Sequence, residues 1–146
     1  MSAQDTVISI ADSDAAIAAC HPVMVELRPH IATPEALVEQ VGRQAAEGYR
    51  LAYVADAGRP VACAGYRIVE MLAHGRFLYV DDLVTLDAER SKGHGDALID
   101  WLEAEARREG CRNLQLDSGT QRTAAHRFYF RKRMVVNSFH FWMALD

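Results

Sequence analysis

The sequence predicts an α/β fold built as one domain over residues 1–146, and three observations support this prediction. The chain has 146 residues and half of them are hydrophobic, which is about the commonest size for a single domain with a sizeable core. Segments with the periods of strands and helices follow one another in the order β, α, α, β, β, β, α, β, α, β. The strand–helix–strand unit around residues 96–109 needs a parallel crossover, so we expect a mixed sheet.

The first third of the chain predicts a strand and two helices. Residues 7–10 are a short apolar strand, after which the polar residues 12–14 offer N-cap oxygens to an Ala-rich helix. Pro22 should break or kink that helix. The second helix begins at a clearer signal, because Thr33 can cap it and Pro34 suits the first helical position.

The middle of the chain predicts a hairpin, a further strand and a long helix. Residues 51–55 and 61–66 flank the turn-rich segment 56–60, which is typical of a β-hairpin. The next strand runs from about residue 77 to residue 86. Residues 96–109 place apolar side chains on one face and charged side chains on the other, as an amphipathic helix does.

The last third predicts a strand at residues 113–116, a short helix at 123–132 and a closing strand at 139–145. In the closing segment large apolar residues alternate with others, as expected for a strand. The apolar positions are Phe139, Phe141, Met143 and Leu145. The exposed side of such a last strand is a candidate surface for a homodimer.

Charge and composition argue against several classes of protein. The formal net charge is -4, so the chain has no global positive field to hold a nucleic acid. No apolar run approaches the roughly 18 residues that a membrane span needs, and residues 1–6 lack the basic start of a signal peptide, so we expect a cytoplasmic protein. The cysteines form no C-x-x-C pair and the histidines no H-x-x-x-H pair, so no metal site is expected.

The most informative segment joins the strand at 77–86 to the helix at 96–109. It contains Arg90-Ser91-Lys92-Gly93-His94-Gly95, a turn at a helix start, where unpaired N–H groups and the positive end of the helix converge. Gly93 and Gly95 let the backbone approach a ligand closely, while Arg90 and Lys92 can add positive charge. The turn predicts a phosphate site, although it matches neither the dinucleotide fingerprint nor the ATP-binding P-loop.

The same turn resembles the R/Q-x-x-G-x-G/A pyrophosphate loop of the GNAT superfamily of N-acyltransferases. Downstream, Ala125-His126-Arg127-Phe128-Tyr129 resembles the A-x-x-F-Y of the family's next helix, and the order of elements agrees. The likeness covers about residues 77–134, and the whole chain more weakly. It implies a GNAT-like mixed, mostly antiparallel central sheet of about six to seven strands flanked by about four helices, with acetyl-CoA as co-substrate and no metal.

The resemblance also implies roles for individual residues. Backbone groups of the strand before the turn would pair with the pantetheine arm and hold the thioester, at Leu83, Val84 and Thr85. The pyrophosphate would be held at Arg90, Ser91, Lys92, Gly93, His94, Gly95 and Asp96. Tyr129 takes the position of the tyrosine that protonates the departing thiolate in many members, and a phenol of pKa about 10 can donate to a thiolate of pKa about 8.5.

The amine that attacks the thioester must first lose a proton, which a carboxylate can accept directly or through water. Asp81 and Asp82, at the start of the thioester strand, are the nearest candidates in the sequence, and Asp81 is favoured. Because consecutive strand residues point to opposite faces, we expect at most one of them to face the cleft. The sequence leaves open whether Asp81, Asp82 or another carboxylate is the base.

The expected activity is transfer of an acetyl group from acetyl-CoA to a primary amine of a small molecule or peptide, by direct attack in a ternary complex. Two departures from the family pattern, Arg122 in place of a common asparagine and Arg133 in place of a common glycine, favour a second hypothesis, a non-catalytic acetyl-CoA sensor or interaction module. A third hypothesis, nucleic-acid binding by the basic helix at 126–133, predicts an affinity that falls steeply with salt. The sequence does not name the amine, the acyl length or the oligomeric state.

Overall fold

The computed structural model describes residues 7–146, which divide into two compact units. The first unit ends at Gln115 and the second is Leu116–Asp146. Residues 1–6, on which the expectation of no signal peptide depends, lie outside the described residues. Within the described part of the chain, no helix has the length and apolar character needed to cross a lipid bilayer.

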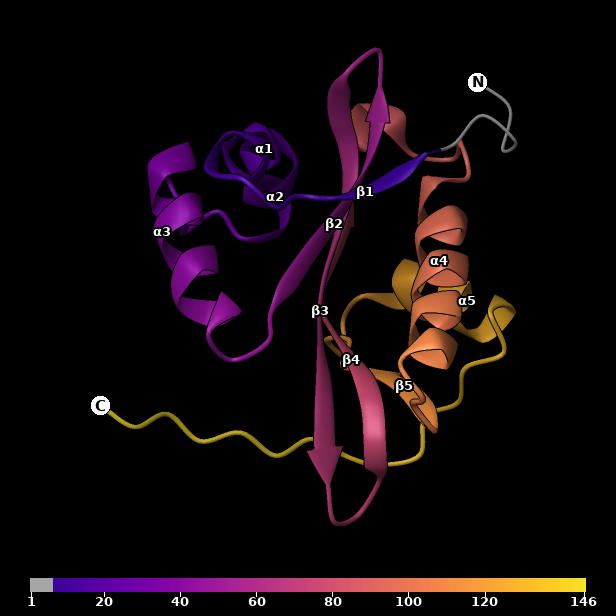
Figure 1. Cartoon of the computed structure of the whole chain (residues 1–146). Helices are drawn as coiled ribbons and strands as arrows, with labels where there is room; N and C mark the ends of the chain where they lie inside the picture. The colour runs from indigo at the N-terminus through magenta and orange to yellow at the C-terminus, as the bar shows by residue number, and fades with distance from the viewer. Residues whose placement is uncertain (1–6) are drawn as a thin grey trace. The chain divides into compact units, whose positions relative to one another are not determined.

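A mixed β-sheet forms the centre of the first unit, as the sequence predicts (Figure 1). In residues 7–146 its strands are β1 (Ile8–Ile10), β2 (Arg50–Asp56), β3 (Arg59–Met71), β4 (Gly75–Thr85) and β5 (Asn113–Leu116), and they lie in that order across the sheet. The pairs β1–β2, β2–β3 and β3–β4 are antiparallel. The chain passes through a helix between β4 and β5, and such a crossover joins parallel strands.

The predicted hairpin between β2 and β3 is confirmed, and its turn has only two residues. Ala57 and Gly58 both have positive φ angles, 51° and 77°. Positive φ at both central positions is the signature of a type I′ turn, whose twist matches that of the flanking strands. The turn therefore starts the pairing of β2 with β3 at Asp56 and Arg59.

Helices cover both faces of the sheet in the first unit (Figure 1). On one face lie α1 (Asp14–Ala19), α2 (His21–Leu27) and α3 (Pro34–Ala45), and on the other lies α4 (His94–Arg108). The predicted caps are confirmed, since Ser13 accepts a hydrogen bond from the Ala16 amide and Thr33 accepts one from the Ala36 amide. The first predicted helix is divided into α1 and α2 at the place where Pro22 was expected to break it.

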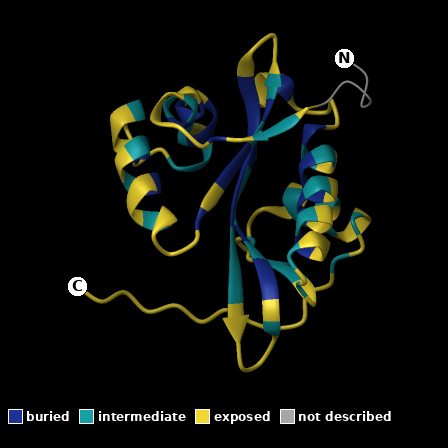
Figure 2. Ribbon diagram, viewed as in Figure 1, coloured by how far each residue is buried: buried dark blue, intermediate teal, exposed yellow. Residues whose placement is uncertain are grey.

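The core follows from this two-sided cover. Every residue of β3 from Pro60 to Tyr66 is buried, because helices pack against both faces of the strand (Figure 2). Toward α1–α3 the core includes Cys20, Val23, Met24, Leu37, Leu51 and Cys63. Toward α4 the buried helix residues are Leu98, Ile99, Leu102 and Ala106, which recur with helical spacing.

The second unit contains α5 (Thr123–Arg131), close to its predicted position, but the predicted closing strand is absent from it. Residues 135–146 form no helix or strand, and Phe139, Phe141 and Trp142 are 86%, 91% and 80% exposed. The described chain therefore has five strands rather than the expected six to seven, although the fold class is confirmed. An alternating pattern gives a segment a strand-like face, but a strand also needs a neighbour to satisfy its backbone.

Candidate active site

Strand β4 contains a β-bulge at Asp81. In the pairing of β3 with β4, Gly65 lies opposite Asp82 and Tyr66 lies opposite Val80, so Asp81 is an extra residue on β4. A bulge interrupts the alternation of side chains and re-aims them, often beside an active site. Both Asp81 and Asp82 line the same cavity as a result. The expectation that at most one of them faces the cleft is therefore wrong.

The carboxylate of Asp82 is fixed by two donors from outside the strand. Arg28, the residue that ends α2, donates from Nε to Oδ1 over 2.8 Å, and the Tyr49 hydroxyl donates to Oδ2 over 2.8 Å. Arg28 also donates from Nη2 to the backbone carbonyl of Asp81, over 3.0 Å, which provides a partner at the bulge. Burial, and next the nearby Asp82 carboxylate, raise the pKa of Tyr49 well above its usual value, so its hydroxyl remains a donor.

Asp81 is paired with a different cation. Arg67 on β3 donates from Nε to both carboxylate oxygens of Asp81, over 3.0 and 3.1 Å. Burial raises the pKa of Asp81, and its hydrogen bond to Arg67 acts in the opposite direction. A raised pKa makes a carboxylate a stronger base at neutral pH, which suits a group that accepts a proton.

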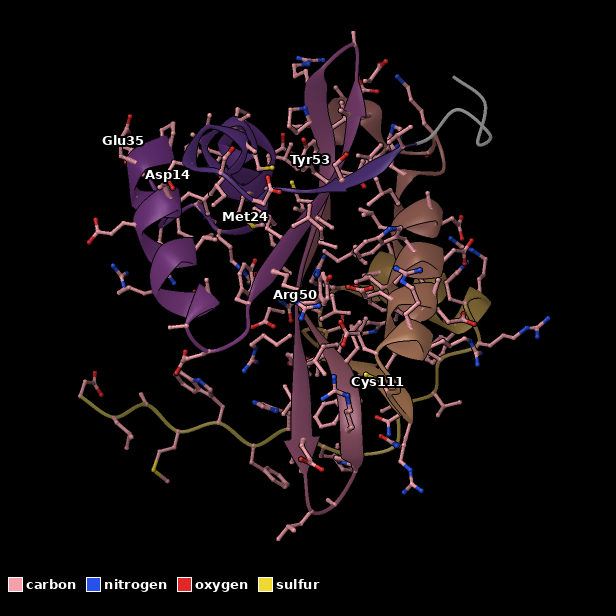
Figure 3. All side chains as sticks on the ribbon, viewed as in Figure 1. Asp14, Met24, Glu35, Arg50, Tyr53 and Cys111 are labelled. Atoms are coloured by element: carbon pink, nitrogen blue, oxygen red, sulfur yellow. The ribbon has the colours of Figure 1, made fainter. Side chains whose placement is uncertain are left out.

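The two aspartates form one end of a cavity of about 280 Å³ between α2, α3 and the sheet. Its other walls are Met24, Arg28, His30, Ile31, Leu37, Gln40, Val41, Gln44 and Tyr49. Those on α3 recur at i, i+3, i+4 and i+7, so one face of the helix lines the cavity. Met24 points from α2 toward the strands (Figure 3). A buried hydrogen bond of 2.8 Å from His21 Nε2 to the Ile31 carbonyl holds the loop that carries His30.

The turn before α4 has the features expected of a phosphate site. A short 3-10 helix, η2 (Asp87–Glu89), follows β4, and Gly93 is the N-cap of α4 with φ 86° and no side-chain cap. The first N–H groups of a helix have no partner within the helix, and together with the positive end of the helix they suit an anion. A Cβ built on Gly93 would have no atom within 4 Å, so the space beside this residue is open. The backbone of the turn therefore fits a diphosphate.

The side chains of this turn contribute less positive charge than the sequence indicates. Arg90 pairs with Asp87 over 3.4 Å, and Lys92 pairs with Glu89. The hydrogen bond from Lys92 lowers the pKa of Glu89. His94 is only 6% exposed and packs as a core residue of α4, so the backbone is the part of His94 that could hold a phosphate. Ligand contacts at residues 90–96 stay a prediction. Main-chain N–H groups would make most of these contacts.

The predicted thioester residues lie at the end of β4, in the part of the strand that extends past the last residue of β5. Leu83, Val84 and Thr85 pair with Ala64, Cys63 and Ala62 of β3. On the other side, the Arg112 amide donates to the Arg76 carbonyl, so β5 begins beside the start of β4. Because parallel strands advance in step, the four residues of β5 end before Leu83 is reached. Among the described residues, no strand therefore pairs with the backbone of Leu83–Thr85 on this side.

Tyr129 lies on α5 in the second unit, half-buried next to Phe128, whose ring centroid is 5.4 Å from its own. Burial raises the pKa of Tyr129, and Arg122 opposes this effect. Arg133 has a φ angle of 66°, a left-handed conformation that suits the glycine common at this position in the resembled family. The role of Tyr129 as proton donor stays a prediction.

Sequence reasoning missed Arg28, Tyr49 and Arg67, the three residues that orient the aspartates. Arg28 is the C-cap of α2, Tyr49 directly precedes β2 and Arg67 lies on β3, all distant from Asp81 and Asp82 in the sequence. None belongs to a motif, and only the folded sheet brings them together. Ser118, in the second unit, was also missed; its hydroxyl is buried without a hydrogen-bond partner among the described residues, which marks a polar position that a ligand could satisfy.

The family model described as Acetyltransferase (GNAT) family matches residues 17–134. The chain is 34% identical over 112 residues to the uncharacterized N-acetyltransferase YhdJ of Bacillus subtilis, covering 77% of this chain and 79% of that one. It is 36% identical over 66 residues to the aminoalkylphosphonate N-acetyltransferase of Salmonella typhimurium, covering 45% and 43% of the two chains.

A solved structure with a coenzyme A analogue shows the same fold. AAC(6')-Iy in complex with the bisubstrate analog CoA-S-monomethyl-acetylneamine matches with a TM-score of 0.80 and 13% identity, over 97% of this chain and 98% of the other. At this level of identity the likeness concerns the fold alone.

Proposed function

Because the chain belongs to the acetyltransferase (GNAT) family, we propose that it transfers an acetyl group from acetyl-CoA to the primary amine of a small molecule or peptide, by direct attack in a ternary complex. The observation that carries this proposal is the bulge of β4. It brings Asp81 and Asp82 to a cavity beside β4, and the residues that follow them, Leu83–Thr85, end the strand and lead toward the Gly93 turn. A site for an amine and a site for a thioester thus share one strand.

The coenzyme would be held largely by main-chain groups. The amides of Ser91–Asp96 suit the diphosphate, since they lie at the start of α4 and the space beside its N-cap, Gly93, is open. Leu83, Val84 and Thr85 would pair with the pantetheine arm, as an added strand pairs with a free edge. When bound, acetyl-CoA supplies the activated acetyl group.

The protein's own residues would manage the protons. Asp81 accepts a proton from the bound ammonium, directly or through water, because a free lone pair is needed for attack. Each oxygen of Asp82 already accepts one hydrogen bond, from Arg28 or from Tyr49, which fixes the carboxylate, and its remaining lone pairs can accept from the amine. Asp82 is therefore better suited to orient the amine than to take its proton. Tyr129 donates a proton to the departing thiolate, and its raised pKa keeps the phenol protonated at neutral pH.

The small-molecule form of the proposal is favoured by the size of the cavity, about 280 Å³. The similar protein of Salmonella typhimurium is named for an aminoalkylphosphonate, which is a small primary amine. A cytoplasmic location and a homodimer, both expected from the sequence, remain predictions.

A second function is favoured by one observation. Both aspartates are already paired with guanidinium groups, as a purely structural carboxylate pair would be. The alternative is a domain that binds acetyl-CoA as a sensor or interaction module without turning it over.

Thiol release from acetyl-CoA, measured over a panel of small amines and peptide N-termini, tests the two functions together with calorimetry of coenzyme binding. The proposed transfer predicts saturable thiol release that depends on the amine, with the acetylated product detected by mass spectrometry. Tight coenzyme binding without thiol release for any amine would support the sensor instead. A protein that binds no coenzyme A would contradict both.

A further inference from the structure

The charged groups around the cavity balance one another. Asp81 and Asp82 contribute two negative charges, and Arg67 and Arg28, which pair with them, contribute two positive charges. The cluster is therefore close to neutral before any ligand enters. A ligand of high positive charge would add charge that nothing in the cluster offsets, whereas a ligand of zero net charge would not.

Arg28 has hydrogen-bonding capacity left on the cavity side. Its Nε and Nη2 are used by Asp82 and by the Asp81 carbonyl, while its Nη1 donates to no group among the described residues. The side chain lines the cavity and is 40% exposed, compared with 13% for its partner Asp82. A guanidinium held at one edge by a carboxylate can still bind a second anion with its free N–H groups.

The remaining walls suit a short carbon chain. Four apolar side chains from α2, the loop after it and α3 form one side of the cavity: Met24, Ile31, Leu37 and Val41. Gln40 and Gln44 continue the α3 face and hydrogen-bond each other over 2.9 Å. The cavity thus combines an acidic group for an ammonium, a basic group for an anion and an aliphatic wall.

We infer that the acceptor amine is a small zwitterion, a short aliphatic primary amine that also carries a carboxylate or a phosphonate, and that Arg28 selects it by binding the acid group. The ammonium lies at Asp81 and Asp82, and the aliphatic part lies against Met24, Leu37 and Val41. This inference rests on the proposed acetyl transfer. It excludes polyamines, whose charge the cluster does not offset, and aminoglycosides, which are polycationic and larger.

A matched substrate series tests the inference on the full-length protein. Propylamine, β-alanine methyl ester, β-alanine and aminoethylphosphonate present a primary amine with no acid, a masked acid, a carboxylate or a phosphonate. Spermidine provides the polycation. We expect kcat/KM to be about tenfold or more higher for an acid-bearing amine than for the ester, which is the scale of one charge-assisted hydrogen bond. The better of β-alanine and aminoethylphosphonate identifies the acid.

The variant Arg28→Gln distinguishes a role of Arg28 in selecting acid-bearing amines from a role in holding the β4 bulge. Loss of the guanidinium should bring the ratio of kcat/KM between the acid-bearing amine and the methyl ester close to one. Damage to the bulge would instead lower kcat/KM for both amines by the same factor. Arg28→Lys keeps the charge without the planar fork and should give an intermediate ratio if Arg28→Gln does not fold. Arg43→Gln, an exposed arginine on α3 paired with Glu39, is the control and should leave the ratio unchanged.

Two results would overturn the inference: an unchanged ratio in Arg28→Gln, or a wild-type preference for propylamine or spermidine. If acetyl-CoA binds but no amine releases thiol, the proposed function fails by itself. Calorimetric titration of β-alanine, aminoethylphosphonate and propylamine then decides the inference independently, because the acid-bearing amines should bind more tightly to the wild type and lose this advantage in Arg28→Gln.

Discussion

The hydroxyl of Tyr49 occupies the place where a side chain at Gly65 would begin. A Cβ built on Gly65 would overlap this hydroxyl and lie 2.7 Å from the ring carbon Cε2. Gly65 is also the residue of β3 opposite Asp82, which accepts the hydrogen bond from Tyr49. The missing side chain at Gly65 therefore makes the room in which Tyr49 reaches across to Asp82.

Gly65→Ala should expel the Tyr49 ring from this position and break its hydrogen bond to Asp82. We expect the free energy of unfolding to fall by about 1–3 kcal/mol, as for overpacking of a core, and amine acetylation to fall with it. Urea denaturation measures the stability. Gly42→Ala in α3, where an added Cβ meets no atom within 4 Å, is the control and should stabilise the protein by about 0.5–1 kcal/mol. A Gly65→Ala protein as stable as wild type would show that the ring can yield at little cost.

Gly93→Ala should weaken coenzyme binding more than it weakens the fold. A left-handed φ of 86° costs a residue with a Cβ about 1–2 kcal/mol, but the added methyl group contacts no protein atom. If a diphosphate occupies the open space, its affinity should fall about tenfold or more, measured as Kd by calorimetry. Equal coenzyme affinity in wild type, Gly93→Ala and the Gly42→Ala control would remove the phosphate from this turn.

Asp81→Asn should lower kcat by about a hundredfold or more, in line with loss of a general base. The base acts when deprotonated, so wild-type kcat should decline as pH falls through the pKa of Asp81, which burial raises above 3.8. The effect on stability has the opposite sign. The folded state holds this proton more tightly, so Asp81 favours folding at low pH and this contribution is lost as pH rises through the raised pKa.

Asp82→Asn is the comparison for Asp81→Asn, because it leaves Arg28 without its carboxylate partner. It should cost stability while retaining the acidic limb of the kcat profile. If Asp82→Asn, and not Asp81→Asn, removed that limb, the base would have to be reassigned to Asp82.

Tyr129→Phe should lower kcat by about a hundredfold or more, because the thiolate would leave without a proton donor. Burial raises the pKa of Tyr129 above its usual value of 10, so the wild-type acid stays protonated up to that raised pKa. The wild-type kcat should fall only as pH rises through the raised pKa of Tyr129. The matched control is Tyr53→Phe on β2, for which full activity is expected. Full turnover by Tyr129→Phe at every pH would exclude Tyr129 as the acid.

The elements that the sequence predicted correctly are those defined by local signals. Thr33 and Pro34 begin α3, Pro22 separates α1 from α2, and the turn around Ala57 joins β2 to β3. These features depend on neighbours a few residues away, so their patterns are visible in the chain itself. The closing strand was wrongly predicted because alternation at 139–145 says nothing about whether a partner strand is available.

The site was only partly predictable, because its geometry depends on pairing between distant segments. The turn at Gly93 and the two aspartates stand out in the sequence. The bulge does not, since it arises from the register between β3 and β4, and neither does the placement of Arg28 and Tyr49 on Asp82. No spacing rule connects residues that meet only after the sheet has formed.

One extra residue in β4 also determines how the chain could evolve. Val80 and Asp82 already pair with the consecutive residues Tyr66 and Gly65, so removing Asp81 would leave every other residue of β4 with its present partner on β3. A single-codon deletion here would therefore restore a regular ladder and keep the sheet, while the cavity would lose one of its two carboxylates.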